Sequence, residues 1–284
     1  MKEYLLPVVD GLPMRDSQQY ARYKLKAVEI YLSITTTSMH KKPWSEMFFL
    51  DLQAGPGKNI IGSDVILGSP LIALNLTHPF TQYRFNEGNS GLAEALRERI
   101  QASELANRVE IYQEDVNQVA YKICDEIDRI DRRPRIENVW STLNVAFLDP
   151  QGLELQWSTV KRLARINKMD LIINFSTMGI NRSAGKKYVE VINEFFGNTD
   201  WQKISSISDS IKRRRQYIEL YLHQLQNLGY HVEEDPNLEQ HDMSMRNSRN
   251  AEVYSLIFAS KNQLGDKFWR QAKKGTNPPK LPGF

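Results

Sequence analysis

The residues best suited to chemistry are acids that directly follow short apolar segments. Residues 47–50 form an apolar run with two phenylalanines, which favours a buried strand of an α/β sheet, and Asp51 comes next. Gly55 and Gly57 then lie in a turn of small residues, where the backbone can approach a ligand without a Cβ in the way. Because ligands bind at the carboxyl ends of strands in open α/β sheets, this pattern indicates a nucleoside-binding site. The spacing matches neither a P-loop nor a G-x-G-x-x-G dinucleotide fingerprint.

Three further acids close later strand-like segments in the same way. They are Glu87, Asp115 and Asp149. A carboxylate after the second strand is well placed to accept the hydroxyl groups of a ribose, which predicts that role for Glu87. Each acid taken singly could instead cap the helix that follows it, Asp115 above all. The recurrence at four successive strand ends favours a site.

The elements that must position these acids alternate between strands and helices. Strands are expected over residues 47–52, 82–86, 109–112, 143–148 and 170–175, and helices over 16–34, 93–105, 116–133 and 156–167, with another opening at 68–70. From the end of the strand 47–52 to Gly68 a loop is expected, and the threonine-rich run 35–38 is expected to end the first helix. This alternation predicts an α/β fold with a parallel sheet and right-handed crossovers.

The pattern changes after residue 175. Helices are expected over 186–196 and 208–228, followed by strands over 230–233 and 252–260. Between these strands lies a long polar loop, 236–250, in which residues 241–247 could form a substrate lid. We therefore expect one α/β domain over residues 1–262, with an N-terminal helical extension, and a basic tail over 263–284.

Composition narrows the class of protein. The chain has 284 residues, a net charge of +3 and one cysteine, Cys124, so it has no internal disulfide framework and no cysteine metal cluster. His223, His231 and His241 lack the spacing of metal ligands. There is no apolar run of 18 residues and no signal-peptide pattern. These features predict a cytoplasmic protein without a membrane segment or a metal.

Two basic stretches are candidates for contact with nucleic acid. One contains Arg213, Arg214 and Arg215, and the other contains Arg270 and Lys273 with aromatic residues interleaved. Basic and aromatic side chains together can follow a nucleic-acid backbone and stack on bases. The alternative is a solvated helix face together with a hydrophobic anchor for the tail.

The acids and motifs together resemble a known family. The order strand, acid, loop, with acids at later strand ends, resembles class I S-adenosylmethionine (SAM)-dependent methyltransferases. More narrowly, the chain resembles the three-Cys-motif partner family of bacterial proteins over about residues 16–262. The similar motifs are Asp51-x-x-Ala54-Gly55-Pro56-Gly57, Gly68-Ser69-Pro70-Leu71-Ile72-Ala73-Leu74, Phe147-Leu148-Asp149-Pro150-x-Gly152 and Leu171-Ile172-Ile173-Asn174-Phe175, together with a helix carrying Lys24 and Tyr31.

This resemblance implies a fold and a site. The fold is a Rossmann-like methyltransferase fold, with a mostly parallel seven-stranded sheet, an antiparallel C-terminal hairpin and helices on both faces. The residues implied to bind SAM are Asp51, Gln53, Ala54, Gly55, Gly57, Glu87, Asp115, Val116 and Asp149. The resemblance also places Asp149 at the sulfonium or the acceptor, and as the nearest acid it is the candidate base. From their own chemistry, Gln151 and Asn174 are candidates for the acceptor side; the alternatives are helix capping or solvation for Gln151 and a hydrogen bond to backbone for Asn174.

Two departures from such proteins limit what the resemblance implies. Gln53 stands where these loops often carry an aromatic residue, and Asp149-Pro150-Gln151-Gly152 is not the Asp-Pro-Pro-Tyr of adenine-N6 methyltransferases. The first hypothesis is a methyltransferase that acts on a nucleic acid or a nucleotide. The second is a catalytically silent subunit that serves a partner protein. An NAD-linked oxidoreductase is disfavoured, because Asp51 precedes the glycine turn and the acid of the third strand would be superfluous.

Overall fold

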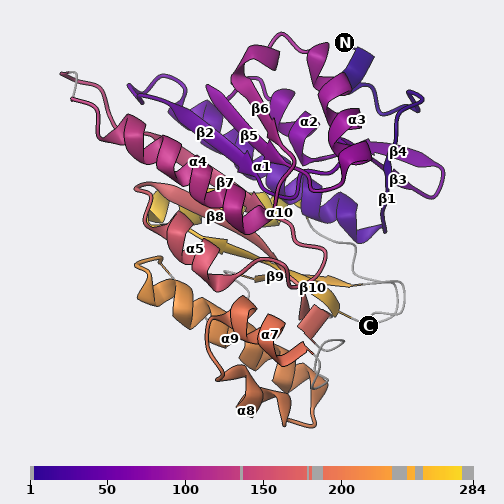
Figure 1. Cartoon of the computed structure of the whole chain (residues 1–284), viewed down its shortest axis with the longest axis vertical. Helices are drawn as coiled ribbons and strands as arrows, with labels where there is room; N and C mark the ends of the chain where they lie inside the picture. Colours follow the sequence, from indigo (N-terminus) through magenta and orange to yellow (C-terminus); the bar gives the residue numbers. More distant parts are fainter. Residues whose placement is uncertain are drawn as a thin grey trace.

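The computed structural model describes residues 3–134, 137–177, 179–180, 188–231, 242–246 and 252–276. Its main sheet contains β2 (Met47–Asp51), β5 (Gln82–Asn86), β6 (Val109–Tyr112), β7 (Leu143–Leu148), β8 (Met169–Phe175), β9 (Asp242–Arg246) and β10 (Glu252–Ala259). The strands lie in the order β6-β5-β2-β7-β8-β10-β9 (Figure 1). The first five are parallel to their neighbours, and β10 is antiparallel to both β8 and β9. The prediction of an α/β fold with a mostly parallel sheet is confirmed.

The strand order contains one reversal that matters for function. The chain runs from the central strand β2 outward to β5 and β6, and then returns to the other side of β2 with β7. Asp51 pairs in register with Phe147, so the carboxyl ends of β2 and β7 lie side by side. A reversal of this kind opens a crevice between the loops that follow the two strands. Both loops carry predicted site residues.

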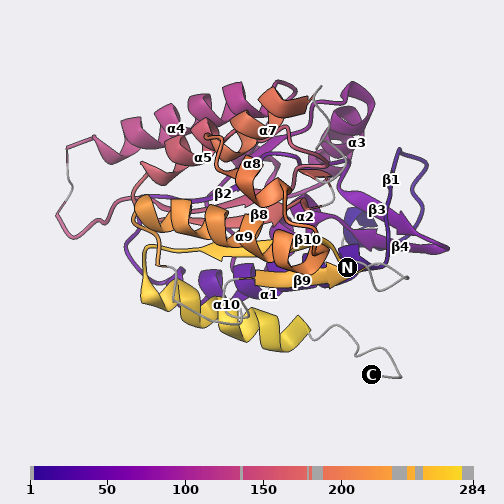
Figure 2. The ribbon, with the colours of Figure 1, turned by 90° about the horizontal axis from the view of Figure 1, so that it is seen from below.

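Helices cover both faces of the sheet. One face carries α1 (Tyr20–Met39), α2 (Ser69–Leu74), α3 (Ser90–Gln101) and α10 (Gln263–Thr276), and the other carries α4 (Val116–Asp131), α5 (Trp157–Ala164), α7 (Val189–Phe196), α8 (Trp201–Ser205) and α9 (Ser210–Asn227). Figure 2 shows α1 and α10 along one side of the sheet, with α4, α5 and α9 on the other. Successive strand residues alternate between the two cores: Phe48 and Leu50 face one, Met47 and Phe49 the other.

A second, smaller sheet lies beside the main one. It consists of β1 (Arg15–Asp16), β3 (Lys58–Ile61) and β4 (Asp64–Leu67), in the order β1-β3-β4. The prediction of a loop over residues 58–67 is therefore wrong. Two short β-branched runs flank a tight turn in which Gly62 has a φ of +62°, and such a sequence forms a hairpin.

Buried charges fasten the N-terminal arm, which we define as residues 8–17, to this region. Asp10 accepts hydrogen bonds from Arg99 at 2.7 and 2.9 Å, and its carboxylate lies 2.9 Å from the Nζ of Lys58. Arg99 is almost fully buried and also donates to the carbonyl oxygens of Pro13 and Pro56. The hydrogen bonds from Arg99 hold the pKa of Asp10 well below its usual value. The arm is therefore fixed against α3 and the loop after β2.

The C-terminal strand pair differs from the prediction. Tyr230 and His231 do not form a regular strand; His231 makes only an isolated bridge with Ser260, and residues 232–233 lie outside the described residues. The partner of β10 is β9 instead, within the segment expected to be a loop. Residues 242–246 alternate polar residues with methionines, a pattern that favours a half-buried strand. The predicted lid over 241–247 overlaps β9, and its remaining residues lie outside the described ones.

Packing also changes two predicted boundaries. The first helix continues through the threonine-rich run to Met39, because Thr35 and Thr36 are buried against the fold. The expected basic tail is, as far as Thr276, the helix α10, whose Phe268, Trp269 and Ala272 are buried in the core beside α1. The boundary predicted at residue 262 does not follow this packing. Residues 277–284 lie outside the described residues.

Candidate functional site

The loop after β2 forms a tight cradle. Gly55 and Gly57 have φ values of +67° and +87°, which side-chain-bearing residues rarely adopt. A Cβ on Gly57 would lie 3.0 Å from a side-chain carbon of Leu96 and 3.1 Å from one of Leu71. The loop is also tied to its surroundings, since Gly68 donates its backbone N–H to the carbonyl of Gly57 at 2.7 Å. The two glycines are thus required by the backbone, as the sequence suggested.

This cradle gives a first prediction. We expect Gly57→Ala to lower the free energy of unfolding by about 2 kcal/mol, because strain at a positive φ is joined by a clash with Leu71 and Leu96. Gly62→Ala is the matched control: its φ is also positive, but nothing lies within 4 Å of its Cβ position. It should cost only about 1 kcal/mol. Urea unfolding curves compare the two, and equal losses would show that the cradle is not tightly packed.

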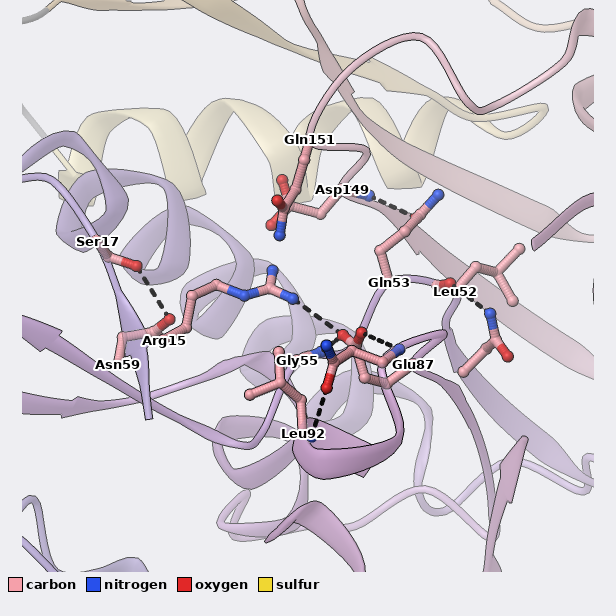
Figure 3. Close-up of polar contacts among 12 residues, drawn as sticks. Arg15, Ser17, Leu52, Gln53, Gly55, Asn59, Glu87, Leu92, Asp149 and Gln151 are labelled. Carbon is pink, nitrogen blue, oxygen red and sulfur yellow. Dashed lines mark hydrogen bonds and ion pairs between the residues drawn. The ribbon is translucent and has the colours of Figure 1, made fainter. Parts of the chain in front are cut away.

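Glu87, directly after β5, joins three segments of the chain. Its Oε2 accepts hydrogen bonds from the backbone N–H of Gly55 and from a guanidinium nitrogen of Arg15, both at 2.9 Å (Figure 3). Its Oε1 accepts from the N–H of Asn89 at 2.9 Å. Glu87, the residue predicted to bind the ribose, therefore lies beside the glycine loop. In this structure it pairs with an arginine of the N-terminal arm.

Asp149, directly after β7, is the centre of a second polar group. The Nζ of Lys24, from α1, lies 2.7 and 2.6 Å from its two carboxylate oxygens, and Asn174 donates its amide to Oδ1 at 2.8 Å. The backbone N–H of Asp149 donates to the side-chain oxygen of Gln53 at 3.1 Å. The predicted residues Gln53, Asp149 and Asn174 thus lie together, and Lys24 joins them.

Asp51 is completely buried behind these two groups. Neither of its carboxylate oxygens makes a hydrogen bond with another described residue. Burial raises its pKa to about 7, and the charge of Asp149 acts in the same direction. Ser69 and the backbone of Gln53 are near enough to lower the pKa, although neither makes a hydrogen bond of ordinary geometry with it. A buried, unpartnered acid at the carboxyl end of the central strand is typical of a functional site.

Two neighbouring pockets collect most of the predicted residues. A pocket of about 460 Å³ is lined, among others, by the predicted residues Gln53, Glu87, Asp115, Val116 and Gln151. A smaller one, of about 50 Å³, is lined by the predicted residues Gln53, Ala54, Gly55, Gly57 and Asp149. Arg15 lines both pockets, whereas Asp51 and Asn174 line neither.

Asp115 has a structural role besides lining the larger pocket. Its carboxylate accepts hydrogen bonds from the N–H groups of Asn117 and Gln118 at 2.9 and 3.1 Å, so it caps the N-terminus of α4. The alternative of a helix cap is therefore correct for this acid. Val116 follows it and is buried at the same wall.

A larger hollow, of about 720 Å³, lies at the opposite edge of the sheet. It surrounds Trp44 and Trp140, whose rings meet edge to face, and the Nζ of Lys168 lies 4.5 Å from the centre of the Trp44 ring. None of the predicted site residues lines it. Its size alone does not make it the functional site.

The three arginines of the first basic stretch each contact another part of the protein. Arg213 donates to the carbonyl of Ile207 at 2.6 Å, Arg214 contacts the hydroxyl of Ser255, and Arg215 lies 3.5 Å from Glu219 of the same helix. These three arginines therefore make separate contacts within the protein.

The second basic stretch is also divided by packing. Arg270 is exposed and Lys273 half-buried on α10, but the interleaved Phe268 and Trp269 are buried, and Trp269 stacks on Phe258 at 5.1 Å. The interpretation of these aromatics as base-stacking groups is therefore wrong. The alternative, a hydrophobic anchor, describes them.

Two residues of the site were missed as site residues by sequence reasoning. Lys24 lies on the apolar stripe of α1 with Ala27 and Tyr31, and a lysine on a buried helix face needs an acidic partner. That signal was available. Arg15 lies in a two-residue strand far from any motif, and nothing in its neighbourhood in the sequence distinguishes it.

Other features of the described residues bear on the class of protein. Among the helices of the described segments, none combines the length and the apolar character that crossing a bilayer requires. Within the same segments, no three His, Cys, Asp or Glu side chains gather where they could hold a metal ion. Cys124 is buried, as predicted, and burial raises its pKa to about 12.

Comparisons with known proteins find distant similarity only. No family model and no curated protein matches the sequence. A Legionella pneumophila protein is 9% identical over 91% of this chain and 93% of its own, with a TM-score of 0.45. The O-methyltransferase TomG from Streptomyces achromogenes, solved with SAM, is 9% identical over 84% and 80%, with a TM-score of 0.41. An O-methyltransferase from Bacillus cereus, solved with SAH, is 12% identical over 88% and 84%, with a TM-score of 0.38.

Proposed function

We propose that the chain binds SAM across the two adjoining pockets and is a SAM-dependent methyltransferase. The observation that carries this proposal is the meeting of a glycine cradle with acids from successive strand ends at one edge of the sheet. The larger pocket, with Glu87, Asp115 and Val116, would hold adenosine, and the smaller one, at the glycine loop, would hold the methionine part. The acceptor, in this proposal, is a nucleic acid or a nucleotide.

The residues present fit a cationic nucleoside. The carboxylate of Asp51 is buried without a hydrogen-bond partner, which is costly unless a positive charge is brought near. The glycine loop leaves its backbone open where a Cβ would clash. Glu87 presents a carboxylate at the position suited to ribose hydroxyls. When bound, SAM supplies an electrophilic methyl group on a sulfonium, so the protein has mainly to position donor and acceptor.

Asp149, Gln151 and Asn174 are the residues that we assign to the acceptor side. Both oxygens of Asp149 accept from Lys24 and Oδ1 also accepts from Asn174, so three of the roughly four acceptor sites of the carboxylate are already used within the chain. The arrangement therefore supports electrostatic positioning by Asp149 rather than proton abstraction. The amides of Gln151 and Asn174 carry both a donor and an acceptor, as pairing with a base edge requires.

One observation favours a second function, a cofactor-binding subunit that is catalytically silent and acts with a three-Cys-motif partner protein. The two acids expected near the donor are already paired with cations of the chain, Glu87 with Arg15 and Asp149 with Lys24. A silent subunit could bind the cofactor with the Asp149–Lys24 pair intact, whereas an enzyme that used Asp149 as its base would have to break this pair. Transfer of a labelled methyl group from SAM to fractionated RNA, DNA and protein separates the two functions, because only the enzyme labels a fraction.

Calorimetric titration with S-adenosylhomocysteine (SAH) tests the site itself. We expect Glu87→Ala to weaken binding by about 1.5–3 kcal/mol, roughly 10- to 150-fold, because charge-assisted hydrogen bonds to the ribose are lost. Glu98→Ala, on the exposed face of α3, is the control and should bind as the natural protein does. If the natural protein does not bind SAH, the proposal fails.

A further inference from the structure

The guanidinium of Arg15 lies on the boundary between the two pockets. It pairs with Glu87 at 2.9 Å (Figure 3). When the amide of Gln151 is turned so that its oxygen faces the arginine, that oxygen lies 3.2 Å from Nη1 and 3.3 Å from Nη2. On its other side, the guanidinium carbon is 3.2 Å from the Cβ position of Gly55. One side chain thus contacts the wall of each pocket.

The backbone that carries Arg15 is held in place. Arg15 pairs in register with Asn59 of β3, and Ser17 bonds both the side chain of Asn59 at 3.1 Å and the carbonyl of Ile60 at 2.9 Å. Asp10, earlier in the arm, is anchored by Arg99. The Nε of Arg15, in contrast, makes no hydrogen bond with any described residue. The backbone of the arm is therefore fixed, so any change of partner by Arg15 has to come from rotation of its side chain.

The two cations that line the smaller pocket are not equivalent. Lys24 spans both oxygens of Asp149 and lies on a buried helix face. Arg15 donates only to Oε2 of Glu87, and it lines both pockets. To release its carboxylate, Arg15 has to break one charge-assisted hydrogen bond, whereas Lys24 has to break two.

From these contacts we propose that Arg15 is a specificity-determining switch. It releases Glu87 to the ribose of the incoming ligand and turns to the carboxylate of that ligand's amino-acid end. This inference rests on the proposed function. In the switch, Arg15 loses its charge-assisted hydrogen bond to Glu87 and forms one to the carboxylate of the ligand. Only a ligand with a carboxylate therefore compensates for the loss of the Arg15–Glu87 pair.

The proposal predicts opposite effects on two ligands. SAH carries the amino-acid end, and 5′-methylthioadenosine carries the same adenosine without it. Removing the guanidinium removes the competitor for Glu87 from both ligands, but it removes a carboxylate partner from SAH alone. We therefore expect Arg15→Ala to bind SAH about 10-fold more weakly and methylthioadenosine at least about 3-fold more tightly.

The experiment is calorimetric titration of both ligands into the natural protein, Arg15→Ala and Arg15→Gln. Arg97→Ala, on the surface of α3, is the control and should leave both affinities unchanged. Arg15→Gln keeps most of the side-chain volume, so agreement between the two variants excludes a collapse of the pocket. Thermal melts verify that each protein is folded.

Each other outcome overturns the switch. Equal weakening of both ligands would mean that Arg15 only shapes the pocket, and tightening of both would mean that it only blocks the site. If neither ligand binds to any of the proteins, the proposed function fails as well, a result distinct from the first two.

Discussion

We expect Asp51→Asn to be more stable than the natural protein by about 2–4 kcal/mol above pH 7. The natural residue buries a carboxylate without a hydrogen-bond partner, and its pKa is raised from 3.8 to about 7. At about 1.4 kcal/mol per pH unit, keeping this group ionised in the folded protein costs on the order of 4 kcal/mol. Asparagine has the same shape and carries no charge, so most of this cost disappears.

The pH dependence follows from the sign of the shift. Between about pH 4 and pH 7 the folded protein binds a proton at Asp51 that the unfolded chain does not. The free energy of unfolding therefore falls as the pH rises through this window and levels off above it. The difference between Asp51→Asn and the natural protein should be small at pH 4 and largest above pH 7. Urea unfolding at a series of pH values measures it.

A second buried acid serves as the matched control. Asp170, at the opposite end of the sheet, accepts a hydrogen bond from Tyr31 at 2.6 Å, and burial raises its pKa to about 6. Asp170→Asn should change stability mainly between pH 4 and 6 and leave SAH affinity unaltered. Asp51→Asn should weaken SAH binding, because a negative charge near a cationic amino group is lost. If Asp51→Asn is neither more stable than the natural protein nor weaker in SAH binding, this account of Asp51 is wrong.

Lys24→Met should destabilise the protein by about 3–5 kcal/mol, because it leaves the carboxylate of Asp149 without its cation in a largely buried place. The side chains of Lys24 and Asp149 are only 11% and 14% exposed, so water compensates little. Methionine fills most of the space of the lysine stem. The decrease in the free energy of unfolding therefore measures the effect of removing the charge and not the effect of a cavity.

The double variant Lys24→Met/Asp149→Asn measures how much of the free energy of unfolding comes from the interaction between the two residues. With both charges gone, we expect a cost well below the sum of the single changes, with a coupling of about 2–3 kcal/mol. Guanidinium unfolding of the four proteins gives this number. Additive losses would show that the two residues act independently. Arg22→Ala and Asp64→Ala, which break an exposed pair at 2.6 Å, form the control cycle and should couple by less than about 1 kcal/mol.

The strand-end acids can be located from the sequence, but the cations that pair with them cannot. Glu87 and Asp149 are recognisable because each follows a strand-like segment, one that alternates polar and aromatic residues before Glu87 and one that is mostly apolar before Asp149. Their cations come from 72 and 125 residues away. No local pattern links residues at such separations, so the ion pairs that fill the site emerge only when the chain is folded.

The differences in the fold have a similar origin. The strand β7 has the predicted bounds, because a buried central strand is a continuous apolar run. The edge strand β9 was missed because it is short and polar residues alternate along it, so composition made the segment look like a loop. The hairpin of β3 and β4 had a local signal, β-branched runs around a glycine, which was overlooked.

The N-terminal arm, which carries Arg15, has a consequence for the order in which the fold assembles. Asp10 leaves the ribosome long before its partner Arg99, which lies 89 residues further along and also holds the carbonyl of Pro56. Until α3 has been synthesised, the glycine loop lacks this brace and the arm has no anchor. The larger pocket therefore depends on long-range contacts that form only as later residues are added, although most of its walls come from the first third of the chain.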